Sequence, residues 1–511
     1  MRFYLAGLVA LALGAPVEAK WHVAESDHFV IYADDSEKNV RRFAAMLEGY
    51  HSAMELASRR KVEKPSPSNR VTIYAVGSAR DVQSLAGTTS RVLAGFYIPR
   101  AGGSVAFVQD LRSTRGEPDE AMSVLLHEYA HHFLISSQRF AMPLWMSEGA
   151  AEFYSSAFFK SDGGVDIGKP NTSRGWELFN AEEVPIRELL DQAAYAKRTS
   201  KRYDAFYGRS WLLYHYLVFA EGRKDQLQQY WLELARGTAA IEAAEKVFGD
   251  LDKLEKELDG YLRLRRMYTY TLPGTALNVG AINVAPLSEG HAAMLPVITT
   301  SKRGVNDEQA AALLVKARAI AARYPQDAAV QAALAEAEFD AGNHAEAIAA
   351  ADRAIASDAA SKNALVQKGL AMFALAEDAD DAGAAYKAAM APFQALNRLE
   401  ADHPYPLIYY YRSFAERGAE PNETARHALE RASTLAPFDL GLAVSTGQML
   451  AQEGKVGGAV ATLQPVAASP HGGGIAAAAK AMIEFLRTQP EGEPVDFSKF
   501  APAISAPEGA Q

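Results

Sequence analysis

Residues 127–131 read His-Glu-Tyr-Ala-His and lie within the largely apolar segment 121–134. On a helix, positions i and i+4 share one face, so the rings of His127 and His131 can grip one zinc ion. Glu128 then lies beside the metal, where it can act as general base on zinc-activated water. The alternative is a pair of histidines on a helix face with no metal.

A zinc ion that activates water needs a third protein ligand and an open fourth position. Residues 143–152 supply Glu148 and Glu152, which share a helix face because they are four apart. Glu152 can accept the other N–H of a ligating imidazole and fix its tautomer. Apolar neighbours such as Trp145 and Phe153 indicate a packed helix, in which a carboxylate needs a cation as partner. The alternative is that both glutamates face solvent.

The segment 127–152 resembles the gluzincin (peptidase MA-like) zinc metallopeptidases, which include the aminopeptidase-N-like and thermolysin-like families. Its Trp145-Met-Ser-Glu148-Gly-Ala stretch looks like the aminopeptidase-N-like block in which a glutamate before glycine binds zinc. The resemblance implies that Glu148 joins the two histidines as the third Zn²⁺ ligand. Another zincin class has Gly and His where this chain has Leu134 and Ser137, so that class is excluded.

The same resemblance implies a tyrosine that stabilises the oxyanion, and Tyr207, before a glycine and an apolar helical stretch, is the candidate. Tyr203 is the alternative. Gluzincins also hold their substrate along an edge strand, for which residues 104–108 are the candidate. This strand has no acidic residue to hold a free amine, so endopeptidase and exopeptidase activity both stay open.

The region before the motif favours a mixed α/β fold. Four β-rich runs occur there, at 28–32, 70–74, 96–98 and 104–108. Helical spacing covers 38–58, the last two runs predict a hairpin, and residues 119–270 are mostly helical in pattern. Together with the resemblance to gluzincins, these patterns imply for residues 20–272 an α+β, zincin-like metallopeptidase domain with a small mixed sheet and active-site helices. We expect a chain that ends near residue 272 to fold and bind zinc.

Residues 305–490 carry an internal period of 34, which separates Pro437 from His471. With small residues at fixed offsets, this period resembles tetratricopeptide repeats, which are stacked helical hairpins. Chance Ala-rich helix pairs are the alternative, and both predict an all-α array of four or five hairpins. Residues 273–304 are treated as a connector, and the tail 491–511, rich in Pro, Ala and Glu, is expected to be loose.

Composition narrows the possible partners. The 511 residues contain 52 Lys+Arg and 62 Asp+Glu, for a net charge of −10, which argues against nucleic acid as a partner. The absence of cysteine excludes disulfides, thiolate zinc sites and cysteine nucleophiles. Arg2 and the apolar run 3–13 predict a signal peptide over 1–19, cut near Ala19. That run is shorter than the about 20 residues that span a membrane, so we expect no membrane span in the mature chain.

These patterns predict an exported zinc-dependent metallopeptidase, periplasmic or secreted, that acts on a peptide or protein substrate. The repeats would recruit a protein partner or that substrate. The signal peptide, the early β-rich run 28–32 and the trailing repeats also resemble exported bacterial peptidase-like proteins classed as domains of unknown function. The alternative is a non-catalytic envelope scaffold whose zinc site is vestigial or structural.

Overall fold

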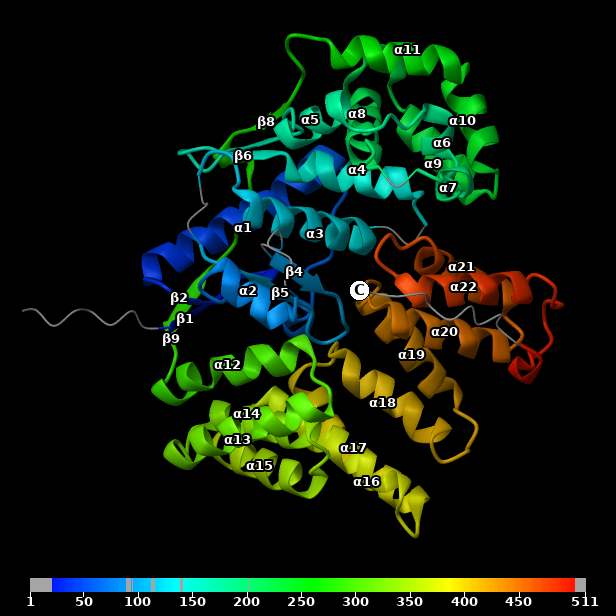
Figure 1. Cartoon of the computed structure of the whole chain (residues 1–511). Helices are drawn as coiled ribbons and strands as arrows, with labels where there is room; N and C mark the ends of the chain where they lie inside the picture. Colours follow the sequence, from blue (N-terminus) through cyan, green and yellow to red (C-terminus); the bar gives the residue numbers. More distant parts are fainter. Residues whose placement is uncertain are drawn as a thin grey trace, which may run out of the picture.

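The computed structural model describes residues 21–88, 93, 95–111, 115–137, 141–200 and 202–500. The signal peptide predicted over 1–19 and the last part of the tail, 501–511, lie outside the described residues. An N-terminal α+β part is followed by a long array of helices that curls around it (Figure 1).

A six-stranded sheet forms the centre of the N-terminal part, in the order β4-β5-β3-β2-β1-β9. Its strands are β1 (Trp21–Glu25), β2 (Phe29–Asp34), β3 (Val71–Ala75), β4 (Gly95–Ile98), β5 (Val105–Val108) and β9 (Asn283–Pro286). Strands β2, β3 and β5 run parallel, whereas β1, β4 and β9 are antiparallel to their neighbours. All four β-rich runs of the sequence form strands, and β4 and β5 form the expected hairpin.

Helices α1 (Glu37–Ser58) and α3 (Glu120–Ser137) cover one face of this sheet. Their buried residues, among them Phe43 and Leu126, share one core with Phe29 and Ile73 of the strands. Further helices follow, namely α2 (Ala79–Ala86), α4 (Leu144–Ser155), α5 (Thr172–Asn180), α6 (Ile186–Leu190), α7 (Gln192–Ala196), α8 (Phe206–Phe219), α9 (Gln226–Ala235), α10 (Ala240–Phe248) and α11 (Leu251–Leu262). A second sheet joins β6 (Ala157–Phe159), β7 (Val165–Ile167) and β8 (Tyr270–Leu272). Short 3-10 helices are η1 (Pro67–Asn69), η2 (Glu221–Arg223), η3 (Gly274–Ala276) and η4 (Phe497–Lys499).

The range 273–304, expected to be a connector, contains the edge strand β9 and the helix α12 (Glu289–Arg303). Leu295 of α12 packs on Tyr74, Val105 and Phe107, on the sheet face opposite α1. A four-residue edge strand gives little periodicity, which is why the sequence did not reveal it. A chain cut before this range would lose both elements and uncover buried aromatic rings, so the expectation that it folds alone is revised.

The C-terminal array runs from α12 to the last helix, and consecutive helices pack against each other. Its other members are α13 (Asp307–Arg323), α14 (Ala328–Asp340), α15 (His344–Ser357), α16 (Lys362–Glu377), α17 (Ala382–Leu399), α18 (Pro404–Ala415), α19 (Glu423–Leu435), α20 (Leu440–Gln452), α21 (Val456–Ala467) and α22 (Gly473–Leu486). Helices α14 and α16 begin 34 residues apart, which matches the period in the sequence. Gly342 and Gly454 adopt φ of +77° and +76° in the turns of two hairpins. No described helix is both long and apolar enough to cross a membrane.

Residues 491–500, expected to be loose, instead pack against the end of the array. The Gly492 amide donates to the Gly454 carbonyl, and the Val495 amide donates to the Ala451 carbonyl. The side chain of Val495 is buried among α20, α21 and α22. Phe497 and Phe500 also pack there, against Phe485 of α22, and the Pro- and Glu-rich composition did not reveal these contacts.

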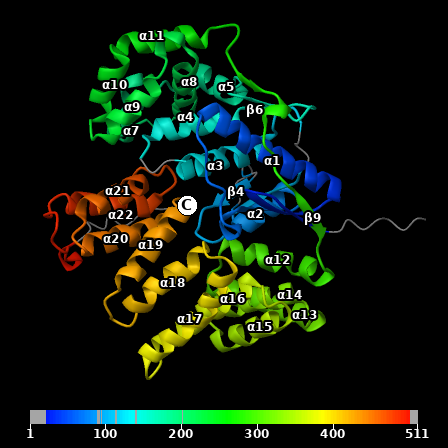
Figure 2. The same ribbon diagram turned by 180° about the vertical axis from the view of Figure 1, so that it is seen from behind.

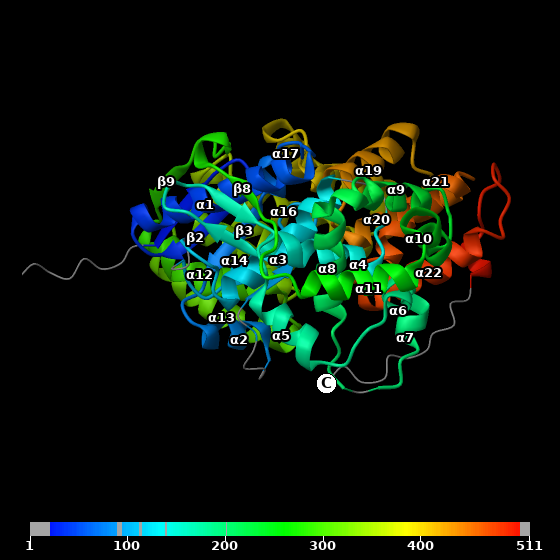
Figure 3. The same cartoon turned by 90° about the horizontal axis from the view of Figure 1, so that it is seen from above.

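The array also contacts the N-terminal part directly. Figures 1 and 2 show its last helices beside α3, and Figure 3 places α21 and α22 at the end of the molecule opposite β9. The Ala101 amide, in the β4–β5 turn, donates to the Asp439 carboxylate at 2.8 Å. The ring of His132 on α3 lies 4.5 Å from that of Phe438. These contacts bring the turn between α21 and α22 close to α3 and α4.

Candidate metal site

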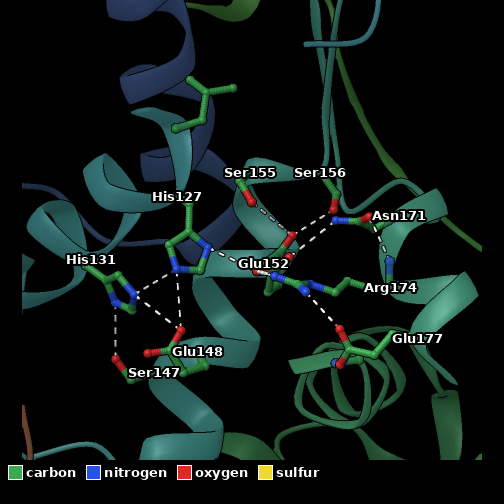
Figure 4. Close-up of polar contacts among 12 residues, drawn as sticks. His127, His131, Ser147, Glu148, Glu152, Ser155, Ser156, Asn171, Arg174 and Glu177 are labelled. Carbon is green, nitrogen blue, oxygen red and sulfur yellow. Dashed lines mark hydrogen bonds and ion pairs between the residues drawn. The ribbon is translucent and has the colours of Figure 1, made fainter. Parts of the chain in front are cut away.

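Two packed helices, α3 and α4, carry the sequence-predicted ligands. The Asp119 carboxylate accepts from the Met122 amide where α3 begins, and Pro143 precedes α4. Leu126 of α3 and Trp145 of α4 are almost completely buried in the shared core. Because these apolar side chains fix the rotation of both helices, the polar side chains beside them face each other (Figure 4).

His127 and His131 of α3 face Glu148 of α4 (Figure 4). The Nε2 atoms of the two rings are 3.1 Å apart. Oε2 of Glu148 lies 3.4 Å from Nε2 of His127 and 3.6 Å from Nε2 of His131. A zinc ion about 2.0–2.2 Å from each ligand atom keeps tetrahedral ligands roughly 3.4 Å apart. The structure therefore brings the three predicted ligands together at a spacing that suits zinc.

The second nitrogen of each ring has a partner of its own. Nδ1 of His127 lies 3.3 Å from Oε1 of Glu152, and Nδ1 of His131 lies 3.3 Å from the Ser147 hydroxyl. Such partners fix the tautomer of a ligating histidine and leave the other nitrogen free for a metal. The sequence analysis anticipated Glu152 in this place but missed Ser147.

The carboxylate of Glu148 is the feature of this site that most favours a bound cation. Its side chain is 1% exposed, and neither carboxylate oxygen has a hydrogen-bond partner. Burying an ionised carboxylate is costly unless positive charge lies beside it, so this donor set fits a bound cation. Burial raises the pKa of Glu148, but the imidazoles of His127 and His131 outweigh it and hold this pKa well below its usual range.

Burial and the nearby carboxylates shift the pKa values of the two imidazoles in opposite directions. Burial lowers the pKa of His127, but Glu148 and Glu152 more than compensate and raise it to about 10. Burial lowers the pKa of His131, so that ring stays neutral. A metal must displace the proton on His127, and metal uptake therefore weakens as the pH falls.

Glu152 connects the site to α5, which the sequence analysis did not include. Its Oε1 accepts from Arg174 at 2.6 Å, and its Oε2 accepts from Asn171 at 3.3 Å. Arg174 also donates to Glu177, which is 1% exposed. Burial raises the pKa of Glu152, but His127 and Arg174 lower it to about 2. The sequence did indicate that a buried Glu152 would need a cationic partner. It did not show that this partner would be Arg174.

Glu128 lies half-buried on α3, the helix that contacts strand β4. Burial, together with the charge of Glu128, raises the pKa of Tyr97 on β4. The Tyr97 hydroxyl in turn lies 2.7 Å from Nδ1 of His132. The charge of the general-base candidate thus acts on a residue of the edge strand, and His132 has a structural contact rather than a place among the ligands.

The edge strand beside α3 is β4, which corrects the assignment of residues 104–108. Strand β5 lies between β4 and β3, and in the described part of the chain β4 ends the sheet on this side. The turn at Gly102 and Gly103 folds residues 95–98 back along the outer side of β5. The sequence showed the hairpin but not which of its strands pairs with β3.

Tyr207 lies at the start of α8 and is 36% exposed. The Arg174 guanidinium lies over its ring, 4.9 Å from the centroid. Burial and the charge of Glu148 raise the pKa of Tyr207 to about 12, so its hydroxyl stays protonated at neutral pH. The hydroxyl of Tyr203, the alternative residue, donates to Glu177 at 2.7 Å. Tyr203 thus binds the carboxylate that Arg174 also contacts.

A fourth candidate ligand comes from the other end of the chain. Nε2 of His471, in the turn between α21 and α22, lies 3.7 Å from Oε1 of Glu148. Its ring centroid is 5.3 Å from that of His131. One potential ligand atom from each of His127, His131, Glu148 and His471 lies within 4.8 Å of the others. In the sequence, His471 was noted only for its spacing from Pro437 in the repeat, with no sign that it lies near this site.

Comparison with known proteins adds little to this description. No protein family matches the chain, and no curated protein matches it either. Among solved structures, a thermophilic tetratricopeptide-repeat protein of Thermus thermophilus matches with 14% identity and a TM-score of 0.33, over 38% of this chain and 99% of that chain. The 34-residue spacing between the starts of α14 and α16 is a feature of this chain's own structure.

Proposed function

We propose that the protein is a zinc-dependent metallopeptidase in which His127, His131 and Glu148 hold Zn²⁺. The main support is the buried Glu148 carboxylate, which has no hydrogen bond and faces two imidazole nitrogens. Glu128 lies on the same helix as both histidines, and this helix contacts β4, which ends the sheet on that side in the described part of the chain. This combination provides a place for the metal, for a general base and for an extended peptide.

Bound zinc would polarise the scissile carbonyl and lower the pKa of the attacking water. Glu128 would accept the proton of that water and later deliver it to the departing amine. Tyr207 would donate its phenolic proton in a hydrogen bond to the developing oxyanion. The substrate backbone would pair with β4, the strand that ends the described sheet on this side and that α3 contacts.

A non-catalytic scaffold with a structural zinc site is the second candidate. It is favoured by His471, because four protein ligands are typical of structural zinc sites. In both cases the helical array would serve as the surface for a protein partner or substrate, and export would follow from the N-terminal pattern.

The two candidates differ in what Glu128→Gln does. In a peptidase, this change should abolish hydrolysis of casein or of a peptide library while zinc content and folding stay as in the parent chain, because Glu128 handles the proton without binding the metal. Glu120→Gln, at the exposed start of the same helix, is the matched control and should stay active. Equal activity of Glu128→Gln and the parent chain would exclude this mechanism.

A further inference from the structure

We propose that His471 is a fourth metal ligand, supplied by the C-terminal array, and that it closes the site. The inference rests on the proposed binding of a metal by His127, His131 and Glu148. It extends that proposal because the metal would then be held jointly by the two ends of the chain.

The geometry around Glu148 supports a four-ligand set. The two histidines of α3 face Oε2 of this carboxylate, whereas Nε2 of His471 lies 3.7 Å from Oε1. The four ligand atoms are within 4.8 Å of one another, so small side-chain rotations reach a tetrahedral spacing of roughly 3.4 Å. Imidazole is also a regular zinc ligand, so the chemistry of the fourth group fits.

The turn that carries His471 is positioned by contacts between the C-terminal array and the N-terminal part. Asp439 at the start of α20 accepts from the Ala101 amide, and Phe438 packs against His132 of α3. Helices α20, α21 and α22 then pack against one another in series. The position of His471 therefore follows from contacts of the array with α3 and with the β4–β5 hairpin.

His471 is also the ligand that can leave. Its side chain is 54% exposed, whereas those of His127, His131 and Glu148 are 15%, 7% and 1% exposed. Residues 472–474 are all glycine, which permits large backbone changes at this turn. The other three ligands belong to two packed helices. Movement of the turn would thus free the position that a hydrolytic zinc site keeps open.

Cobalt replacement in the full chain tests this contact directly. The chain contains no cysteine, so His471→Cys introduces a single thiol. If residue 471 reaches the metal, Co²⁺ added to this variant should give a near-ultraviolet thiolate-to-cobalt charge-transfer band. His427→Cys, at an exposed position of α19, is the matched control and should give none. A His471→Cys spectrum equal to that of the control would overturn the proposal.

His471→Ala provides a second measurement. The dissociation constant for zinc should rise at least about tenfold, and peptide hydrolysis should become faster because the fourth position is free. An unchanged zinc affinity, or slower hydrolysis with an unchanged cobalt spectrum, would contradict a closing ligand. If the charge-transfer band appears but no chain hydrolyses peptides, the ligand assignment stands and the peptidase proposal fails. If the parent chain binds neither metal, both proposals fail.

Discussion

The Glu152 side chain connects a proposed metal ligand, His127, to the rest of the fold. Its carboxylate lies between Nδ1 of His127 and the guanidinium of Arg174, which in turn holds Glu177. In this arrangement the ring of His127 is oriented by a group that is itself held by an arginine. Removing Glu152 should therefore loosen the ring without removing a ligand.

We expect Glu152→Ala to bind zinc about 10- to 100-fold more weakly than the parent chain, in line with the loss of other orienting partners. Competition with a chromophoric chelator measures this affinity. Glu242→Ala, at an exposed position of α10, is the control and should leave it unchanged. A Glu152→Ala chain with the affinity of the control would show that Glu152 does not orient His127.

At the scale of single residues, the sequence predicts the candidate ligands that lie close to the His-Glu-Tyr-Ala-His motif along the chain. His127, Glu128 and His131 follow from helical spacing, and Glu148 follows from the resemblance to gluzincins. The sequence could not place Arg174 or His471, since both meet the site only through tertiary packing of α5 and of the array. Long-range contacts of this kind leave no periodic signal along the chain.

At the scale of the elements, the contact between α4 and α8 sets the position of Glu148. A Cβ at Gly149 would lie 2.3 Å from the carbonyl oxygen of Ser210 on α8 and 2.7 Å from its carbonyl carbon. Both are backbone atoms and cannot rotate away. The glycine that follows Glu148 is therefore required by the packing of two helices.

We expect Gly149→Ala to destabilise the protein by about 1–3 kcal/mol through overpacking and to lower zinc retention, because α4 must move away from α8. Thermal unfolding and elemental analysis measure both effects. Gly260→Ala is the control: this residue is also helical, and no described atom lies within 4 Å of its Cβ position. It should leave stability unchanged or raise it by about 0.5–1 kcal/mol. Equal stability of the two variants would contradict the packing argument.

At the scale of the whole molecule, the sheet that contains β1 has strands from both sides of the domain boundary expected at residue 272. Strand β9 pairs with β1, and α12 covers Tyr74 and Phe107. The sequence predicted the α+β part and the helical array separately, because periodicity is local. It did not show that the range 273–304 contributes to both the sheet and the array. Strand β9 pairs with β1, and the whole N-terminal part lies between these two strands in the sequence.

We expect a chain that ends at residue 272 to aggregate, because it exposes the aromatic face that α12 covers. A chain that ends at residue 304 keeps β9 and α12 and should remain soluble, with a lower melting temperature than the full chain. Size-exclusion chromatography and thermal unfolding of both chains check this. A soluble, monomeric chain ending at 272 with a cooperative unfolding transition would instead support a domain boundary at residue 272.

The central claim is that α3 and α4 build a zinc site, and elemental analysis of the purified chain tests it most directly. Prepared without chelators, the parent chain should contain about one zinc per molecule, as expected for a set of His and Glu ligands on packed helices. His131→Ala should contain far less, while His427→Ala should match the parent chain. Zinc far below one per molecule in the parent chain, or equal zinc in His131→Ala, would contradict this account.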